Sequence, residues 1–167
     1  MSLNTLRPWF DEINDPADHT QLVELHDILI DDFITNPFTL GGKIIKIDHW
    51  ETKVAQYRPF CETFFHLITR KSEFGNARFF TPERANRIHW IKPILLSHPT
   101  KQITYFKWKD QRGICKEHFW LFSKNFMVVT RDIGQDMKIV TAFCVDKDLK
   151  QGYHERYSDY REGKSDC

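Results

Sequence analysis

With 167 residues and a formal net charge of +1, the chain is long enough for one domain with a substantial core, and 14 Phe and five Trp indicate that this core is aromatic. No apolar run approaches the roughly 20 residues of a membrane span, and no signal peptide is apparent, so we expect a soluble cytoplasmic protein without a membrane partner. The four cysteines lie far apart and form no Cys-x-x-Cys pair, which favours reduced thiols over a structural zinc site.

The first half of the chain has mainly helical periodicity. Residues 15–34 carry leucines at helical spacing and predict an acidic helix, which the sequence "TNPFTLGG" ends. Three elements are expected after it: a short strand at 43–48, a helical or mixed segment at 51–71 and a loop at 72–80.

The segment Thr81–Pro93 begins like a capped helix and is expected to bend or stop at Pro93. On a helical wheel, Arg84 continues the apolar stripe formed by Ile88 and Ile91, whereas His89 lies on the opposite side. Arg84 therefore either extends over the edge of the core or points into a cleft.

From residue 102 the hydrophobic period changes to two, which predicts strands. The candidates are 102–108, 118–124, 126–132 and 137–145. Their short polar connections are typical of an antiparallel meander, so helices followed by this four-stranded meander predict an α+β fold. In the first strand, Phe106 alternates with Tyr105 and Lys107, and we expect one buried and one open face.

We divide the chain into an acidic helical segment at 1–40, a central domain at 41–150 and a charged tail at 151–167. The tail carries three tyrosines at helical spacing, Tyr153, Tyr157 and Tyr160. It can dock on the domain or fray.

Charge is strongly segregated along the chain. Residues 1–36 contain eight acids and one base, whereas residues 66–109 contain nine Lys or Arg, two acids and three histidines. A basic centre that contains histidines is expected where a polyanion such as RNA is bound. The alternative is that the two segments neutralise each other in the fold.

The residues of this basic centre suit metal-independent RNA cleavage. Only Glu73 and Glu83 supply carboxylates there, and the chain has neither a phosphate-binding glycine loop nor a GxSxG motif. In the expected reaction, the 2′-hydroxyl attacks the neighbouring phosphorus while side chains move protons and cations stabilise the phosphate charge. We therefore expect neither a metal nor a cofactor.

Three pieces, "FFHLITRK", "ERANRIHWIKPIL" and "MKIVTAFCV", occur in this order around the helices and the meander. In this the chain resembles the barnase/EndoU/colicin/RelE-like (BECR) superfamily of ribonucleases, most closely its phage-encoded and polymorphic-toxin branches. The resemblance covers roughly residues 43–145. It implies a nuclease domain at 41–150, an endoribonuclease acting as a toxin or phage effector in the bacterial cytoplasm, and a possible antitoxin or immunity protein as a partner.

The resemblance also implies roles for single residues. His66 corresponds to the acid/base histidine of the helical half, with Arg70 one turn later on the same side. Thr141 matches the hydroxyl residue of the final strand that binds the scissile phosphate, and Arg84 and Lys107 match cations of the family by position. Other interpretations stay open, because His66 is surrounded by phenylalanines as a core histidine would be, and Thr141 suits a strand by propensity alone.

We expect RNA contacts from Arg84, Arg87, Tyr105 and Lys107. Tyr105 and Lys107 share a strand face that could stack a base and pair with a phosphate, although a solvated face is equally compatible with the pattern. No second histidine has a clear place in the sheet, since His118 opens its strand and its face is undecided. A Lys or Arg partner for His66 is therefore expected.

Two other classes of function fit the same sequence. One is a non-catalytic RNA-binding module that uses the basic centre. The other is an immunity or structural protein whose acidic N-terminal helix docks a basic partner.

Overall fold

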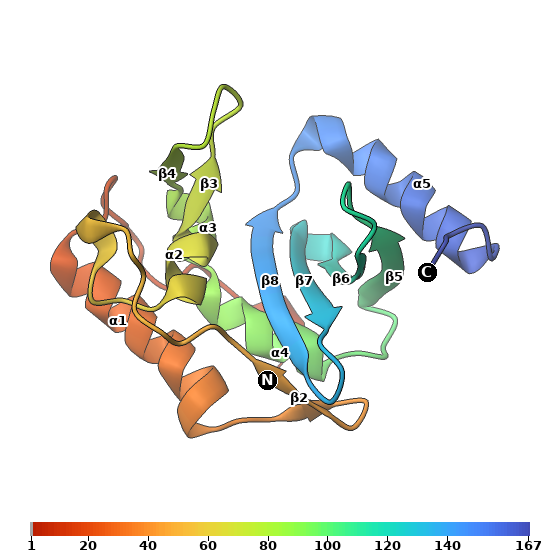
Figure 1. Cartoon of the computed structure of the whole chain (residues 1–167), viewed down its shortest axis with the longest axis horizontal. Coiled ribbons are helices and arrows are strands. Elements are labelled where there is room, and N and C mark those ends of the chain that lie inside the picture. Colours follow the sequence, from red (N-terminus) through yellow and green to blue (C-terminus); the bar gives the residue numbers. More distant parts are fainter. Residues whose placement is uncertain (1) are drawn as a thin grey trace.

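The C-terminal half of the chain forms the predicted meander within a larger curled sheet (Figure 1). The computed structural model describes residues 2–167 and confirms the α+β class. The strand order is β1-β2-β8-β7-β6-β5, with β2 and β8 parallel and the other pairs antiparallel. The strands are β1 (Thr39–Leu40), β2 (Lys43–Lys46), β5 (Ile103–Lys109), β6 (Cys115–Leu121), β7 (Phe126–Asp132) and β8 (Met137–Cys144). A separate antiparallel pair is formed by β3 (Thr69–Lys71) and β4 (Arg78–Phe80).

Helices cover the sheet on both faces. They are α1 (His19–Ile30), α2 (Glu62–Ile68), α3 (Pro82–Ala85), α4 (Ile91–Leu96) and α5 (Lys150–Arg161). A π-helical segment (Asp31–Thr35) continues α1, and 3-10 turns form at Leu3–Thr5, Ala55–Tyr57, Ile88–Trp90, Phe122–Lys124 and Lys147–Leu149. Asp18 caps α1, because its Oδ1 accepts a hydrogen bond from the backbone N–H of Gln21 at 2.9 Å.

The single helix expected from Thr81 to Pro93 is wrong, because the segment breaks at Asn86. The Asn86 side chain accepts a hydrogen bond from the Phe10 backbone N–H at 2.7 Å and donates one to the Phe10 carbonyl at 2.9 Å. This pairing with a distant segment ends α3. Pro93 then lies in the first turn of α4, where a missing N–H costs no helical hydrogen bond.

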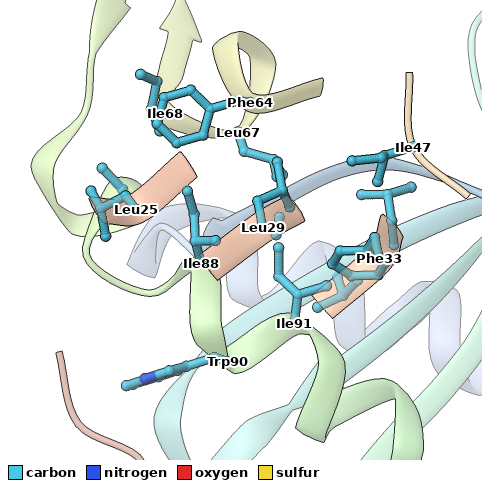
Figure 2. Packing of buried hydrophobic residues seen from close by; sticks show 14 of the residues in the cluster. Leu25, Leu29, Phe33, Ile47, Phe64, Leu67, Ile68, Ile88, Trp90 and Ile91 are labelled. Carbon is cyan, nitrogen blue, oxygen red and sulfur yellow. The ribbon is translucent and has the colours of Figure 1, made fainter. Parts of the chain in front are cut away.

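The main core lies between the helices and one face of the sheet. Figure 2 shows apolar side chains of this cluster from α1, α2 and the segment leading into α4. Its members include Leu25, Leu29, Phe33, Phe64, Leu67, Ile68, Ile88, Trp90 and Ile91. The leucine spacing that predicted α1 is therefore the stripe that this helix buries.

A second apolar cluster lies on the other face of the sheet. Phe106, Trp120 and Met127 are fully buried there, and the tyrosines of α5 pack against them. The first meander strand therefore has one buried and one more open face, as expected: α5 covers Phe106, whereas Tyr105 and Lys107 on the opposite face are half-buried and line a cavity.

The expectation of reduced thiols is wrong for two of the cysteines. Cys115 and Cys167 form a disulfide across 52 residues of sequence, whereas Cys61 and Cys144 are free. None of the described helices is sufficiently long and apolar to cross a membrane.

Candidate active site

A small cavity lies between the β3–α3 segment and the end of β8, and it collects three of the predicted site residues. Arg70 comes from β3, Arg84 from α3 and Thr141 from β8. Its volume is about 240 Å³, and Asp146 and Tyr153 also line its wall. We call it the arginine cavity.

Arg84 is held in this cavity by its surroundings. Its Nη1 donates to the Thr69 carbonyl at 3.1 Å, and its guanidinium carbon lies 5.6 Å from the centre of the Phe143 ring. Burial, together with the charges of Arg70 and Arg78, lowers the pKa of Arg84 to about 10. Of the two alternatives that the sequence left open for Arg84, the structure shows the second, because its side chain lines a cavity.

Arg78 is a third cation at this place, and the sequence analysis missed it. Its Nε donates to Thr69 Oγ1 at 2.9 Å, and its Nη2 donates to the carbonyls of Thr69 at 2.9 Å and His66 at 3.3 Å. Arg78 is thereby fixed at the end of α2. Arg78 lies on β4, inside the segment expected to be a loop. In the sequence, only its position within the basic centre indicated that it could contribute to a site.

Among the described residues that line the cavity, one ion pair involves an arginine, and it joins Arg70 to Asp146. The Nη2 atom of Arg70 lies 2.8 Å from Asp146 Oδ2, and about half of each side chain is exposed. Such an exposed pair contributes little to stability and can be exchanged for another anion at low cost. The arginine cavity thus has more cationic than anionic groups close to its wall, with Arg70, Arg78 and Arg84 against Glu83 and Asp146.

His66 does not line the arginine cavity. Its Nε2 lies 3.0 Å from Glu62 Oε1, and 43% of its side chain is exposed. Burial and the charge of Arg78 lower the pKa of His66, while Glu62 opposes the shift. The expected helical relation to Arg70 is wrong, because α2 ends at Ile68 and Arg70 lies in a strand.

The face of His118, left undecided by the sequence, is that of Thr141. Cross-strand partners run Phe106–His118–Val129–Thr141, so these four side chains form one row across the sheet. His118 is only 8% exposed and stacks on Phe106, with ring centres 4.6 Å apart. Burial lowers the pKa of His118 to about 4, so its imidazole is neutral near pH 7.

His118 lines a second cavity of about 530 Å³, which we call the histidine cavity. The two cavities share Thr141, Phe143 and Tyr153, so they adjoin along one face of the sheet. A β-bulge lies at their junction: Val129 pairs with Thr141 but Thr130 pairs with Ile139, which leaves Val140 unpaired. Such bulges redirect side chains and are common next to active sites.

The other three predicted RNA contacts lie elsewhere. Arg87 donates to the Glu83 carbonyl at 2.9 Å and covers Trp90. Tyr105 and Lys107 line a different cavity, on the sheet face opposite Phe106, and the Tyr105 hydroxyl donates to Glu117 Oε2 at 2.7 Å. Their role in RNA binding stays a prediction, at surfaces separate from the arginine cavity.

The structure places arginines and a hydroxyl group around one cavity and two imidazoles with lowered pKa values nearby or in the adjoining cavity, and such groups can serve phosphoryl-transfer chemistry. Within residues 2–167, no group of three or more His, Cys, Asp or Glu side chains is arranged to hold a metal ion. Comparisons with protein-family models, with curated proteins and with solved structures found no match to this chain.

Proposed function

We propose that the chain is a metal-independent endoribonuclease that cleaves RNA by attack of a 2′-hydroxyl on the adjacent phosphate. The observation that carries the proposal is Arg84, a desolvated cation between Arg70 and Arg78, with the Thr141 strand on the other wall of its cavity. A partly buried cation beside other cations is costly, and an anion bound among them removes that cost.

In this proposal the arginine cavity binds the scissile phosphate. Arg84 and Arg70 contact its non-bridging oxygens, and the phosphate replaces Asp146 as the partner of Arg70. The Thr141 hydroxyl donates a hydrogen bond from the opposite wall. Because Arg84 is held by the Thr69 carbonyl before substrate arrives, it stabilises the additional negative charge of the transition state without rearranging.

His66 is proposed to accept the proton of the 2′-hydroxyl. Its lowered pKa keeps the imidazole neutral near pH 7, and the Glu62 carboxylate orients the ring and stabilises it once protonated. The leaving 5′-oxygen takes its proton from solvent water. The substrate strand would then extend from the arginine cavity toward α2.

The resemblance to BECR ribonucleases adds a biological setting to the proposal. It favours a toxin or phage effector that acts on RNA in a bacterial cytoplasm. A neutralising antitoxin or immunity protein belongs to the same hypothesis.

The test is incubation of the purified protein with total RNA and with tRNA in EDTA. We expect cleavage that leaves a cyclic phosphate or a 3′-phosphate, and no cleavage of DNA, which lacks the 2′-hydroxyl. RNA that stays intact both in EDTA and with added Mg²⁺ would overturn the proposal.

One observation favours a non-catalytic RNA-binding module as the second candidate. The predicted acid/base residue His66 lies outside the cavity that collects Arg70, Arg84 and Thr141. The same incubation separates the two functions, because a binding module retards RNA in a gel without cutting it.

A further inference from the structure

The C-terminal helix covers the sheet face that carries His118 and Thr141. No residue of α5 is itself buried, yet the side chains beneath it are fully buried. The helix is polar, and three tyrosines attach it to the apolar cluster, Tyr153, Tyr157 and Tyr160. An element attached in this way is drawn from the less stable part of a fold.

Side chains of the same segment contact aromatic and charged groups that could otherwise bind a nucleic acid strand. The Arg156 guanidinium lies 5.5 Å from the ring centre of Trp108 and 5.1 Å from that of Tyr153, within the histidine cavity. Aromatic faces of this kind stack nucleobases. Ahead of the helix, Asp146 pairs with Arg70 at the arginine cavity. Residues 146–161 therefore contribute side chains to the walls of both cavities.

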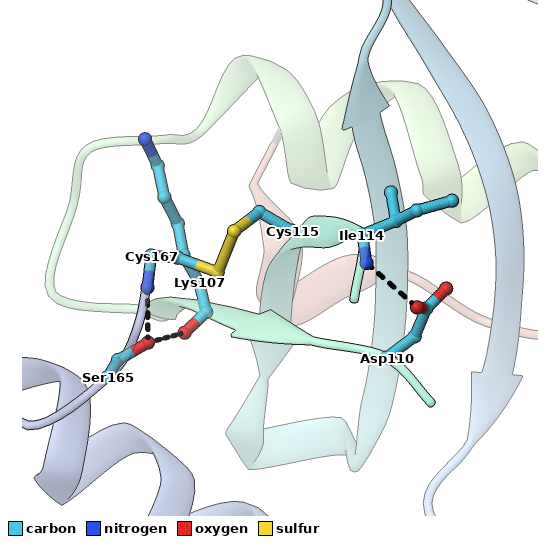
Figure 3. The surroundings of a disulfide bond; sticks show 6 residues. All are labelled: Lys107, Asp110, Ile114, Cys115, Ser165 and Cys167. Atoms are coloured by element: carbon cyan, nitrogen blue, oxygen red, sulfur yellow. Dashed lines mark hydrogen bonds between the residues drawn. A yellow bond between two sulfur atoms is a disulfide. The ribbon is translucent and has the colours of Figure 1, made fainter. Parts of the chain in front are cut away.

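A covalent bond holds the end of this segment on the sheet. Figure 3 shows the disulfide between Cys167 and Cys115 at the start of β6. Ser165 Oγ also donates to the Lys107 carbonyl at 3.0 Å. Both cysteines are partly exposed, so a thiol reductant can reach the bond.

We propose that residues 146–167 form a redox-controlled cover, locked by the disulfide Cys115–Cys167, over the adjoining arginine and histidine cavities, which together we call the RNA groove. The inference rests on the proposed function and concerns the regulation of that site. A dithiol reductant supplies two electrons and two protons: the S–S bond breaks, Cys115 and Cys167 become thiols, and the two sulfurs of the reductant join in a disulfide.

Reduction acts on the cover by a shift in population. With the disulfide intact, α5 can lift from the sheet only while its far end stays attached to β6. Without the disulfide, only the tyrosine contacts and the exposed ion pair hold it, so the open state becomes more populated. The open state exposes the Trp108 face and releases Arg70 from Asp146, and the groove then admits a longer RNA strand.

The experiment compares the full chain in three forms: oxidised, reduced by a dithiol, and Cys167→Ser. Hydrogen exchange is measured for residues 150–161, and RNA cleavage is measured in EDTA on the same samples. We expect exchange in α5 to be at least about tenfold faster in the reduced and Cys167→Ser forms, with faster cleavage. Cys167→Ser should be insensitive to the reductant, whereas the control Cys61→Ala, which removes a free thiol, should respond as the unaltered chain does.

The two readouts separate this inference from the proposed function. Unchanged exchange in α5 after reduction overturns the cover, whether or not RNA is cut. Faster exchange with slower cleavage also overturns it, because α5 would then be part of the active site. Faster exchange with no cleavage in any form supports the redox-controlled opening and overturns the ribonuclease.

Discussion

At the scale of single residues, Arg84 is the group that most distinguishes this site from a solvated basic surface. It is partly buried, it donates to a backbone carbonyl, and two further arginines, Arg70 and Arg78, lie close enough to lower its pKa. Arg87, three residues later, instead bonds the Glu83 carbonyl and covers Trp90 outside the cavity. The two arginines therefore form a matched pair for mutation.

Arg84→Gln is expected to weaken RNA binding and cleavage strongly, because the central cation of the phosphate site is lost. Stability should stay within about 1 kcal/mol, since a desolvated charge is removed together with one hydrogen bond. Arg87→Gln should weaken RNA binding and cleavage much less, because Arg87 lies outside the arginine cavity. RNA titrations and urea unfolding of both variants check this, and equal effects of the two changes would show that the arginine cavity has no special role.

His66→Ala is expected to lower the cleavage rate by roughly 10²-fold or more while RNA affinity is retained, which is the usual size of general acid–base catalysis. Thr141→Val should also slow cleavage but leave the pH profile unchanged, because a hydroxyl ligand does not titrate. Single-turnover rates between pH 5 and 8 measure both effects. Unaltered cleavage in His66→Ala would show that His66 is not the general base.

His118 makes a separate prediction about stability and pH. Its folded pKa of about 4 lies below the ordinary value of 6.5, so between these values the unfolded chain binds a proton that the native chain does not. Its stabilising contribution is therefore complete above about pH 6.5 and decreases as the pH falls toward 4, by on the order of 3 kcal/mol. Lys116 and Arg156 add to the burial effect. Urea unfolding of His118→Gln should show a flatter stability–pH curve in this range; an unchanged slope would contradict the prediction.

At the scale of elements, the local sequence pattern was sufficient to predict strands whose pairing partners are close in sequence. The strand β7 has the predicted bounds 126–132, because alternating apolar residues lie between two short polar connections. The strand β6 begins at Cys115, three residues before the prediction, because pairing with β5 extends it through polar residues. It ends at Leu121, because the next residues turn to Asn125, which adopts a φ of 54° that asparagine tolerates.

The features that the sequence did not predict depend on pairing between segments that are distant in sequence. The break after α3 depends on Asn86 bonding to Phe10, which no local periodicity encodes. Within the site, the basic centre and the resemblance identified Arg70, Arg84 and Thr141, whereas Arg78 and His118 depend on strand pairing and cross-strand register. The docking of α5 has the same origin, because only its three tyrosines mark its inner face.

The disulfide should contribute measurably to the stability of the whole fold. In the chain-entropy account, closing a loop of about 52 residues restricts the unfolded chain, and removing such a bond typically costs about 2–4 kcal/mol. Cys167→Ser should therefore unfold at a lower urea concentration than the oxidised chain, and reduced wild-type protein should match the variant. Equal midpoints for the oxidised and reduced chains would contradict this.

At the scale of the whole molecule, charge segregation survives folding. Among the ion pairs of residues 2–167, none joins an acid of residues 1–36 to a base of residues 66–109. The two segments thus form no ion pair with each other, although Lys92 lies close enough to Asp32 to oppose the increase that burial causes in the pKa of its carboxyl, and the cations of the arginine cavity stay available for an anionic ligand.

The most direct test of the central proposal uses one RNA oligonucleotide that the protein cuts, and a copy with a single 2′-deoxy nucleotide on the 5′ side of the cut. Both are incubated with the purified protein in EDTA, and the product ends are determined by mass spectrometry. The proposed mechanism predicts a 2′,3′-cyclic phosphate or 3′-phosphate from the first, and no cut at the altered position of the second. Equal cleavage of both oligonucleotides at that position would contradict attack by the 2′-hydroxyl.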